Sequence, residues 1–320
     1  MRVLVYGAGV IGGLLAHELC RTGQDVTVLA RGAWKHELVT RGLQVRHYLQ
    51  RRTTVDQVRV IETLEPGDCY DLIFVAMQAQ QRPAVLDVLA ANQSKRVVMV
   101  GNDLDTATTE ARLRCVHPEK EVAFAFQLTG GRREDGQIIA IHAGRMLCVG
   151  AREGALGPSF LAAVKRALSG RGYQVVPTEN MAAWLQAHAA MILPGAYLCY
   201  LTGFDLRRTN DRQRAQMVAA TREAIEALVQ MGVPVPAEQV KALRGRRNLL
   251  LLRAFTWLAA KTAIGRLAAA DHCRVAGAEM AHLDAQFYRL LSKSGQRLPA
   301  WESLRAAALP LLRQAAGGAR

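Results

Sequence analysis

The sequence predicts an α/β domain with a parallel sheet over residues 1–177, followed by an all-α domain over residues 178–320. The chain has 320 residues, enough for two cores at ~100–200 residues per domain. Its first half alternates β-branched runs with helical patterns, as parallel strands joined by crossover helices do. After Pro177 the pattern is almost wholly helical.

The expected strands of the first half are short aliphatic runs at residues 3–6, 26–30, 72–76, 97–100, 122–126 and 173–176. Helical patterns cover residues 12–21 and 82–91. Residues 43–49 and 55–61 are expected to pair as an edge hairpin. A second hairpin is expected from residues 138–143 and 145–149, closed by the turn Ala143-Gly144.

The helical half is interrupted at Gly203, at residues 232–236 and at residues 295–299. Its most apolar stretch, residues 249–270, contains Arg253, Lys261 and Arg266, which a lipid-spanning helix rarely tolerates. No basic-then-apolar leader follows Met1, so we expect a cytoplasmic protein. The six cysteines form no regular framework and are interpreted as reduced core thiols.

The formal net charge of +14 raises the question of an anionic partner. It comes from 34 Arg and only 7 Lys, and such a bias fits a GC-rich genome equally well. The arginine clusters lack interleaved aromatics and match no nucleic-acid module; they are Arg207-Arg208, Arg212, Arg214, Arg244 and Arg246-Arg247. We interpret them as solvated helix ends and expect neither a nucleic-acid nor a membrane partner.

A glycine motif follows the first expected strand directly. Residues 3–6 run into Gly7-Ala8-Gly9-Val10-Ile11-Gly12, and an amphipathic helix follows. In this G-x-G-x-x-G context the first glycine permits a tight turn, the second clears space for a pyrophosphate, and the third lets the helix approach the strand. The helix amides then point at the phosphates. The first domain is therefore predicted to be a Rossmann-type dinucleotide-binding domain.

Arg31 follows the second expected strand, where an NAD-binding domain carries Asp or Glu for the ribose 2′-hydroxyl. A carboxylate there would repel a 2′-phosphate, whereas a guanidinium can bind one with two hydrogen bonds. The alternative is a solvated arginine in an Arg-rich chain. The sequence favours NADP(H) over NAD(H).

With these features the chain resembles the ketopantoate reductase (2-dehydropantoate 2-reductase) family over nearly its whole length. The matching segments are residues 7–12, 30–32, 75–78, 100–102 and 132–138, Trp184, and Glu279 twenty residues before Pro299. The resemblance implies a helical domain like the C-terminal domain of 6-phosphogluconate dehydrogenase. It also implies reduction of a 2-keto acid with hydride from NADPH and no metal.

The resemblance assigns roles to several residues. Asn102 matches an asparagine near nicotinamide and substrate, and Glu279 matches an acid that meets the substrate hydroxyl and the cofactor. The family's proton-donating lysine corresponds to Gln186, whose carboxamide cannot supply a proton at neutral pH. Substrate-binding asparagines of the family correspond to Ala190, Pro194 and Asp284, and a lysine near the cofactor corresponds to Gln78.

Three explanations of these departures remain open. The enzyme reduces a less polar carbonyl or imine, with a proton from His188, Tyr197, Tyr200, Glu279 or water. Alternatively it binds NADP without catalysis, as a regulatory or interaction protein. Or the register in this helix differs and a nearby basic residue replaces the lysine.

Two further features stay undecided. Lys261 would have a lowered pKa if buried, although such a lysine more often extends its ammonium group to solvent. The apolar residues 249–252 and 268–270 either belong to the core or contribute to a homodimer.

Overall fold

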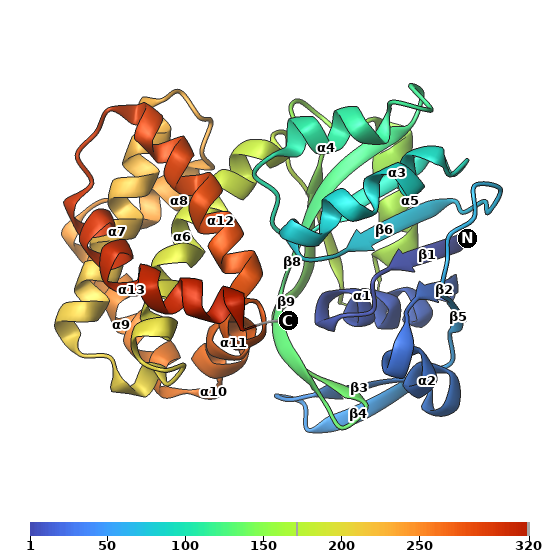
Figure 1. The fold of residues 1–320 in the computed structure, drawn as a ribbon, viewed down its shortest axis with the longest axis horizontal. Coiled ribbons are helices and arrows are strands. Elements are labelled where there is room, and N and C mark those ends of the chain that lie inside the picture. Colours follow the sequence, from blue (N-terminus) through green and yellow to red (C-terminus); the bar gives the residue numbers. More distant parts are fainter. Residues whose placement is uncertain (171, 319–320) are drawn as a thin grey trace. The chain divides into compact units, whose positions relative to one another are not determined.

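A computed structural model describes residues 1–170 and 172–318 of the chain. The chain divides into two compact units between Ala182 and Ala183. This division falls five residues after the boundary expected at Pro177. The N-terminal unit contains all the strands of the sheet, and the C-terminal unit is helical (Figure 1).

The N-terminal unit is built on one 10-stranded sheet with the path β4-β3-β9-β8-β7-β6-β1-β2-β5, and β10 pairs with β9. Its strands are β1 (Arg2–Tyr6), β2 (Asp25–Leu29), β3 (Leu43–His47), β4 (Arg52–Asp56), β5 (Arg59–Ile61), β6 (Leu72–Ala76), β7 (Arg96–Val100), β8 (Glu121–Glu134), β9 (Gln137–Gly150) and β10 (Gln174–Pro177). Strands β2, β1, β6, β7 and β8 are parallel neighbours, which confirms the expected parallel sheet.

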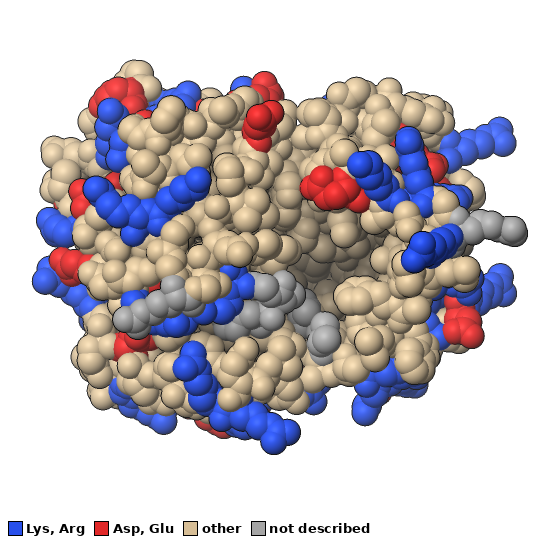
Figure 2. Space-filling view, turned by 180° about the vertical axis from the view of Figure 1, so that it is seen from behind, with Lys and Arg blue, Asp and Glu red and all other residues tan. Residues whose placement is uncertain are grey.

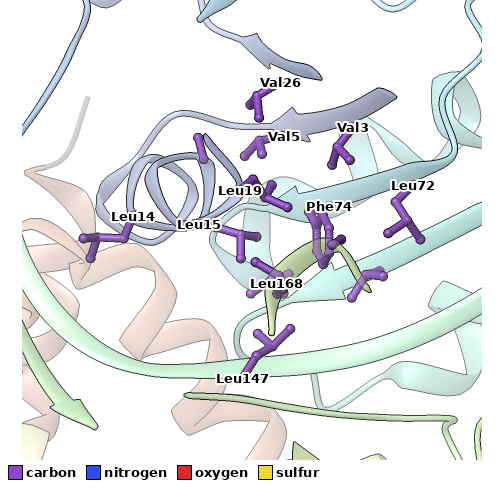
Figure 3. Packing of buried hydrophobic residues seen from close by; sticks show 14 of the residues in the cluster. Val3, Val5, Leu14, Leu15, Leu19, Val26, Leu72, Phe74, Leu147 and Leu168 are labelled. Atoms are coloured by element: carbon purple, nitrogen blue, oxygen red, sulfur yellow. The ribbon is translucent and has the colours of Figure 1, made fainter. Parts of the chain in front are cut away.

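The helices of this unit are α1 (Val10–Arg21), α2 (Gly32–Arg41), the 3-10 helix η1 (Ala79–Ala84), α3 (Leu86–Ala91), α4 (Thr106–Leu113) and α5 (Pro158–Leu168). Leu14, Leu15 and Leu19 of α1 are fully buried in one cluster with Val5 and Phe74 of the sheet (Figure 3). The helix expected over residues 82–91 is divided between η1 and α3. Pro83 explains the division because it lacks a backbone N–H.

The second expected hairpin is wrong in its turn. One strand, β9, includes both residues of the expected turn, although its register against β8 shifts between Gln127 and Thr129. The surroundings of Ala143 and Gly144 lie outside the described part of the chain. The antiparallel partner of β9 is β8, and Asp135 and Gly136, with φ of 50° and 75°, make the turn between them. The left-handed backbone required there suits an Asp-Gly pair, which fixes the turn at that point.

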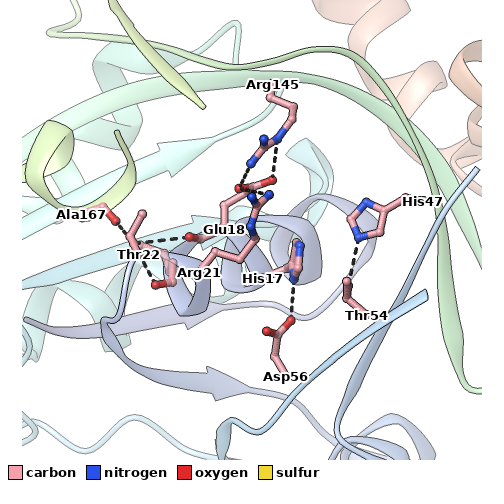
Figure 4. Close-up of polar contacts among 10 residues, drawn as sticks. His17, Glu18, Arg21, Thr22, His47, Thr54, Asp56, Arg145 and Ala167 are labelled. Carbon is pink, nitrogen blue, oxygen red and sulfur yellow. Dashed lines mark hydrogen bonds and ion pairs between the residues drawn. The ribbon is translucent and has the colours of Figure 1, made fainter. Parts of the chain in front are cut away.

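The first expected hairpin is correct in β3 and β4, which pair antiparallel. The second expected strand, residues 55–61, is divided, because β5 leaves β4 and pairs with β2 at the other edge of the sheet. At the division Asp56 accepts a hydrogen bond from His17 Nδ1 of α1 at 2.6 Å (Figure 4). This hydrogen bond connects the end of β4 to α1.

The C-terminal unit is helical, as expected. Its helices are α6 (Met181–Leu201, which begins two residues before the division), η2 (Leu206–Arg208), α7 (Asp211–Gln230), α8 (Ala237–Ala242), α9 (Arg246–Lys261), α10 (Ala263–Gly265), the π-helix η3 (Arg266–Ala270), α11 (Asp271–Val275), α12 (Gly277–Leu291), η4 (Ser292–Ser294) and α13 (Pro299–Gly317). The breaks expected at Gly203, residues 232–236 and residues 295–299 fall at or beside helix ends. Trp301 and Phe287 are fully buried between α12 and α13.

The expectation that the cysteines are core residues is wrong in part. All six cysteines are free, and Cys148, Cys199 and Cys273 are buried. Cys69 and Cys115 are exposed. Both lie in loops that follow polar residues, where no helical or strand periodicity marks a buried side.

Lysine and arginine side chains are scattered over the face drawn in Figure 2. Two members of the arginine clusters have partners in the fold: Arg207 pairs with Asp205 at 2.8 Å, and the buried Arg214 pairs with Asp211. Lys261 is exposed, and its Nζ donates to the carbonyl of Arg207 at 2.7 Å.

Helix α9 leaves five large apolar side chains at least half exposed: Leu250, Leu251, Phe255, Trp257 and Leu258. A homodimer, one of the two alternatives left open for the apolar residues of this segment, stays a prediction that sedimentation equilibrium would test. Within the described residues, no helix is both long and apolar enough to span a bilayer.

Candidate functional site

The turn between β1 and α1 has the conformation that its glycines require. Gly7 has φ of +102°, and a Cβ there would lie 2.5 Å from the Ala76 carbonyl oxygen. A Cβ on Gly12 would lie 1.8 Å from the Gly7 carbonyl oxygen. Gly9 differs, because no atom lies within 4 Å of its Cβ position. The fold therefore needs Gly7 and Gly12, whereas Gly9 leaves open space.

Helix α1 begins beside that open space. Gly9 is its N-cap and offers no side chain to the first amides, and residues 10–13 include no acidic side chain. The amides of a helix's first turn have no partner within the helix, and the dipole makes this end positive. Gly9 and the start of α1 therefore fit an anionic group such as a pyrophosphate.

Arg31 follows β2 as the N-cap of α2, and its side chain is exposed. Its Nε donates to the carbonyl of Glu62 at 3.0 Å. The carboxylate of Glu62 pairs with Lys35 at 2.9 Å. Arg31 Nε thus orients the guanidinium, and Lys35 compensates the negative charge of Glu62.

The loops after β6 and β7 carry the next expected residues. Gln78 is the N-cap of η1, and its Oε1 accepts from Gln80 at 2.7 Å. Asn102 follows β7 and is 9% exposed. In addition, the buried Arg82 pairs with Asp103 at 3.0 Å and donates to the Val100 carbonyl at 3.0 Å. Sequence reasoning missed this ion pair, since an arginine before a proline carries no pattern that marks burial.

The parallel order β2-β1-β6-β7 places these loops at one edge of the sheet. The carboxyl ends of parallel strands lie on the same side, where open α/β sheets bind their ligands. The structure therefore brings Gly7–Gly12, Arg31, Gln78 and Asn102 to one edge of the N-terminal unit.

Helix α6 carries three of the expected residues of the helical unit. Gln186 is half-buried, and its Oε1 has no hydrogen-bond partner among the described residues. Ala190 and Pro194, at i+4 and i+8, are buried. The helix contains neither Lys nor Arg at any position, so no shift of register along it supplies a lysine.

Three of the expected proton donors have structural contacts instead. His188 stacks on Trp184, and burial, with a contribution from His272, lowers the pKa of His188 to about 4. Tyr197 donates to Asp284 Oδ1 at 2.7 Å, and Tyr200 donates to the Cys273 carbonyl at 2.9 Å. Burial raises the pKa of both tyrosines. At neutral pH none of the three is an available acid.

Asp284 also differs from its expected role in substrate binding. Its two oxygens accept from Arg305 Nε and Nη2 at 2.7 and 2.8 Å, and Tyr197 donates to the same carboxylate. The side chain is almost fully buried. Because both oxygens have partners within the helical unit, we reinterpret Asp284 as the centre of a structural network.

Glu279 lies in the first turn of α12 and is 4% exposed. His272 of α11 places Nε2 at 3.5 Å from Glu279 Oε2, and its side chain is 41% exposed. Sequence reasoning missed His272, because the two residues lie on different helices separated by a break at Ala276. Among the described residues, no group of three or more His, Cys, Asp or Glu could hold a metal.

The parallel sheet and the glycine turn after β1 together define a Rossmann-type N-terminal unit. A helical C-terminal unit follows it in the chain. Residues 3–152 match the family model "Ketopantoate reductase PanE/ApbA". This part of the chain is therefore similar to the PanE/ApbA ketopantoate reductase family. A comparison with curated protein sequences gave no match.

Solved structures share the fold over nearly the whole chain. The PanE/ApbA family ketopantoate reductase from Ralstonia eutropha JMP134 has a TM-score of 0.73 and 20% identity, covering 98% of this chain and 99% of its own. The 2-dehydropantoate 2-reductase from Methylococcus capsulatus has a TM-score of 0.69 and 19% identity, with 98% of each chain covered. D-mandelate dehydrogenase with NADH and anilino(oxo)acetate has a TM-score of 0.72 and 16% identity, covering 98% and 99%.

Proposed function

We propose that the protein is an NADPH-dependent oxidoreductase that reduces a 2-keto acid or a related carbonyl or imine. The observation that carries this proposal is the gathering of Gly7–Gly12, Arg31, Gln78 and Asn102 at the carboxyl ends of four neighbouring strands. The family match over residues 3–152 supports it. When bound, the cofactor would supply the hydride.

Each residue at this edge has a part in holding the cofactor. The amides at the start of α1, beside the open space at Gly9, would hold the pyrophosphate. Arg31 would bind the 2′-phosphate through its outer nitrogens, because its Nε is occupied by Glu62. Gln78 and Asn102 would lie toward the nicotinamide. NADH is the competing cofactor, since one structural relative holds it.

The substrate proposal depends on α6. Two relatives are named for a 2-keto or a 2-hydroxy acid, 2-dehydropantoate and D-mandelate. In this chain Gln186, Ala190 and Pro194 stand where the resemblance implies a lysine and two asparagines. These residues offer fewer charges and hydrogen bonds, so we expect a less polar substrate and poor turnover of ketopantoate.

Two measurements test this function. Fluorescence titration should show NADPH binding, with NADH bound more weakly. A panel of 2-keto acids with apolar and polar side chains should give NADPH oxidation, with apolar members faster than ketopantoate. Binding of neither nucleotide would contradict the proposal, and ketopantoate turnover with a kcat near ~10 s⁻¹ would contradict the role given to Gln186.

The second candidate is a non-catalytic NADP-binding regulatory or interaction protein. Gln186 favours it, because a carboxamide cannot donate a proton to a carbonyl oxygen. This candidate predicts NADPH binding without turnover of any keto acid, ketone or imine, and a protein partner recovered by pull-down. A cytoplasmic location remains a prediction in either case.

A further inference from the structure

The buried Arg82 joins the loops that follow β6 and β7 in the N-terminal unit. It belongs to η1, whose N-cap is Gln78. Its Nη1 lies 3.0 Å from Asp103 Oδ2, and its Nη2 donates to the carbonyl of Val100, the last residue of β7, at 3.0 Å. One guanidinium thus connects the segment that Gln78 begins with the segment that contains Asn102.

The Arg82 guanidinium lies against the residues on both sides of Asn102. Before Asn102, Gly101 has φ of +112°, and a Cβ there would lie 3.2 Å from Arg82 Nη2. The glycine therefore permits both the left-handed backbone and the close approach of the guanidinium. After Asn102, Asp103 forms the ion pair with Arg82. The same side chain thus holds the backbone before and after Asn102.

The carboxylate of Asp103 is itself held by further hydrogen bonds. The backbone N–H of Asp105 donates to its Oδ1 at 2.9 Å. Thr109 Oγ1 of α4 donates at 2.9 Å to its Oδ2, the same oxygen that faces Arg82. Because both oxygens have partners and the side chain is buried, Arg82 has an ion-pair partner of defined position.

Stability alone does not explain an arginine at position 82. Arg82 Nε is buried and has no hydrogen-bond partner among the described residues. An unpaired buried donor costs free energy, and a buried ion pair is often no more stable than apolar residues of similar volume. A guanidinium can, however, hold two acceptors at fixed positions at once. The pair is therefore better suited to fixing the loop after β7 than to stabilising the fold.

We propose that Arg82 is a positioning residue that fixes Asn102 for contact with the nicotinamide end of the cofactor. This inference rests on the proposed function, in which Gln78 and Asn102 lie toward the nicotinamide. Arg82 acts through the backbone at residues 101 and 103 and does not contact the cofactor. A loop held in place before binding loses less conformational entropy when the cofactor binds, which raises the affinity.

The test is a double-mutant cycle on cofactor binding. NADPH affinity is measured by fluorescence titration for wild type, Arg82→Met, Asn102→Ala and the double variant. The matched control is Arg145→Met, because Arg145 donates from Nε and Nη2 to the buried Glu18 near the end of α1 in the same unit. Urea unfolding shows whether each variant is folded. Arg82→Lys, which keeps the positive charge, replaces Arg82→Met if the latter does not fold.

We expect Asn102→Ala to bind NADPH ~3–10-fold more weakly than wild type, the range for one lost hydrogen bond. Arg82→Met should weaken binding to a similar extent, because Asn102 then loses its fixed position. The double variant should bind no more weakly than Asn102→Ala, since two residues that act through one contact do not add their losses. Arg145→Met should unfold at a lower urea concentration but bind NADPH like wild type.

The outcomes separate this inference from the proposed function. If wild type binds no NADPH, the proposed function and the inference both fall. If wild type binds NADPH and either single variant binds it equally well, or the two losses multiply in the double variant, Arg82 does not act through Asn102 and the proposed function stands. An equal loss in Arg145→Met would also overturn the inference, because cofactor binding would then follow the overall stability of the unit.

Discussion

His188 lies stacked on Trp184, one helical turn earlier in α6, with ring centroids 5.1 Å apart and ring planes 12° apart. His188 is the titratable residue of α6 nearest in sequence to Gln186. Because desolvation lowers the pKa of His188 to about 4, its imidazole is neutral at pH 7 and cannot donate a proton to a substrate. The histidine is part of the folded helix's packing. The free energy of unfolding should therefore depend on whether His188 is protonated.

The stability of the fold should fall in acid because of His188. An unfolded histidine has a pKa of ~6.5, so between that value and about 4 the unfolded state binds the additional proton. The shifted pKa of His188 contributes up to ~3 kcal/mol to the free energy of unfolding. This contribution is complete above pH 6.5 and is lost as the pH falls toward 4. Urea unfolding at pH 7.5 and 4.5 measures it. His188→Asn should show a smaller difference between these pH values; an equal difference would contradict the assignment.

Removing Arg305 should destabilise the helical unit strongly. Asp284 is buried and would lose a bidentate partner, which costs ~3–5 kcal/mol for a broken buried pair. Arg305→Met should lower the free energy of unfolding by this amount in urea titrations. The control is Arg207→Met in the exposed pair with Asp205, which should leave the free energy of unfolding nearly unchanged because solvent screens an exposed pair. Equal small effects would show that the Asp284 network does not stabilise the fold.

Thiol reactivity should follow burial. Cys69 and Cys115 are exposed and should react first with a thiol reagent on the native protein. Burial and the neighbouring Asp56 raise the pKa of Cys20 to about 12, so Cys20 should react only after unfolding. Mass spectrometry after brief iodoacetamide treatment identifies the labelled sites. Rapid labelling of Cys20 would be inconsistent with the contacts between α1 and β4.

Arg31 should set the preference for NADPH. Arg31→Ala removes a charged donor from the 2′-phosphate, and hydrogen bonds to charged groups contribute ~1.5–3 kcal/mol. NADPH affinity should fall ~10–100-fold, since ~1.4 kcal/mol corresponds to a factor of ten. NADH affinity serves as the internal control and should hardly change. Equal loss for both nucleotides would mean that Arg31 supports the fold instead.

Local sequence patterns were sufficient to predict the residues at the sheet edge where we propose that the cofactor binds. The turn after β1 depends on glycines within six residues of one another, and Arg31 is identified by its place directly after a strand. The polar contacts of the helical unit could not be read in this way. Tyr197 and Asp284 are 87 positions apart, and His272 meets Glu279 across a break between helices.

The expected strand over residues 55–61 was divided for a similar reason. Its residues are suited to strands at either edge of the sheet, and Asp56, the last residue of β4, contacts His17 in α1, 39 positions earlier in the chain. A residue's partner thus has to be known before its role can be assigned. The same holds for Asp284, which is acidic and near the matched Glu279 but is committed to Arg305.

The most direct measurement of the central claim is NADPH binding by Gly9→Ala. No atom lies within 4 Å of the Gly9 Cβ position, so the variant should unfold at the wild-type urea midpoint, whereas Gly12→Ala, whose Cβ meets a carbonyl at 1.8 Å, should be destabilised. Calorimetry should show NADPH binding by wild type and at least a ~10-fold loss in Gly9→Ala, because the methyl group occupies the pyrophosphate's place. Undiminished binding by Gly9→Ala, or no binding by wild type, would contradict the account.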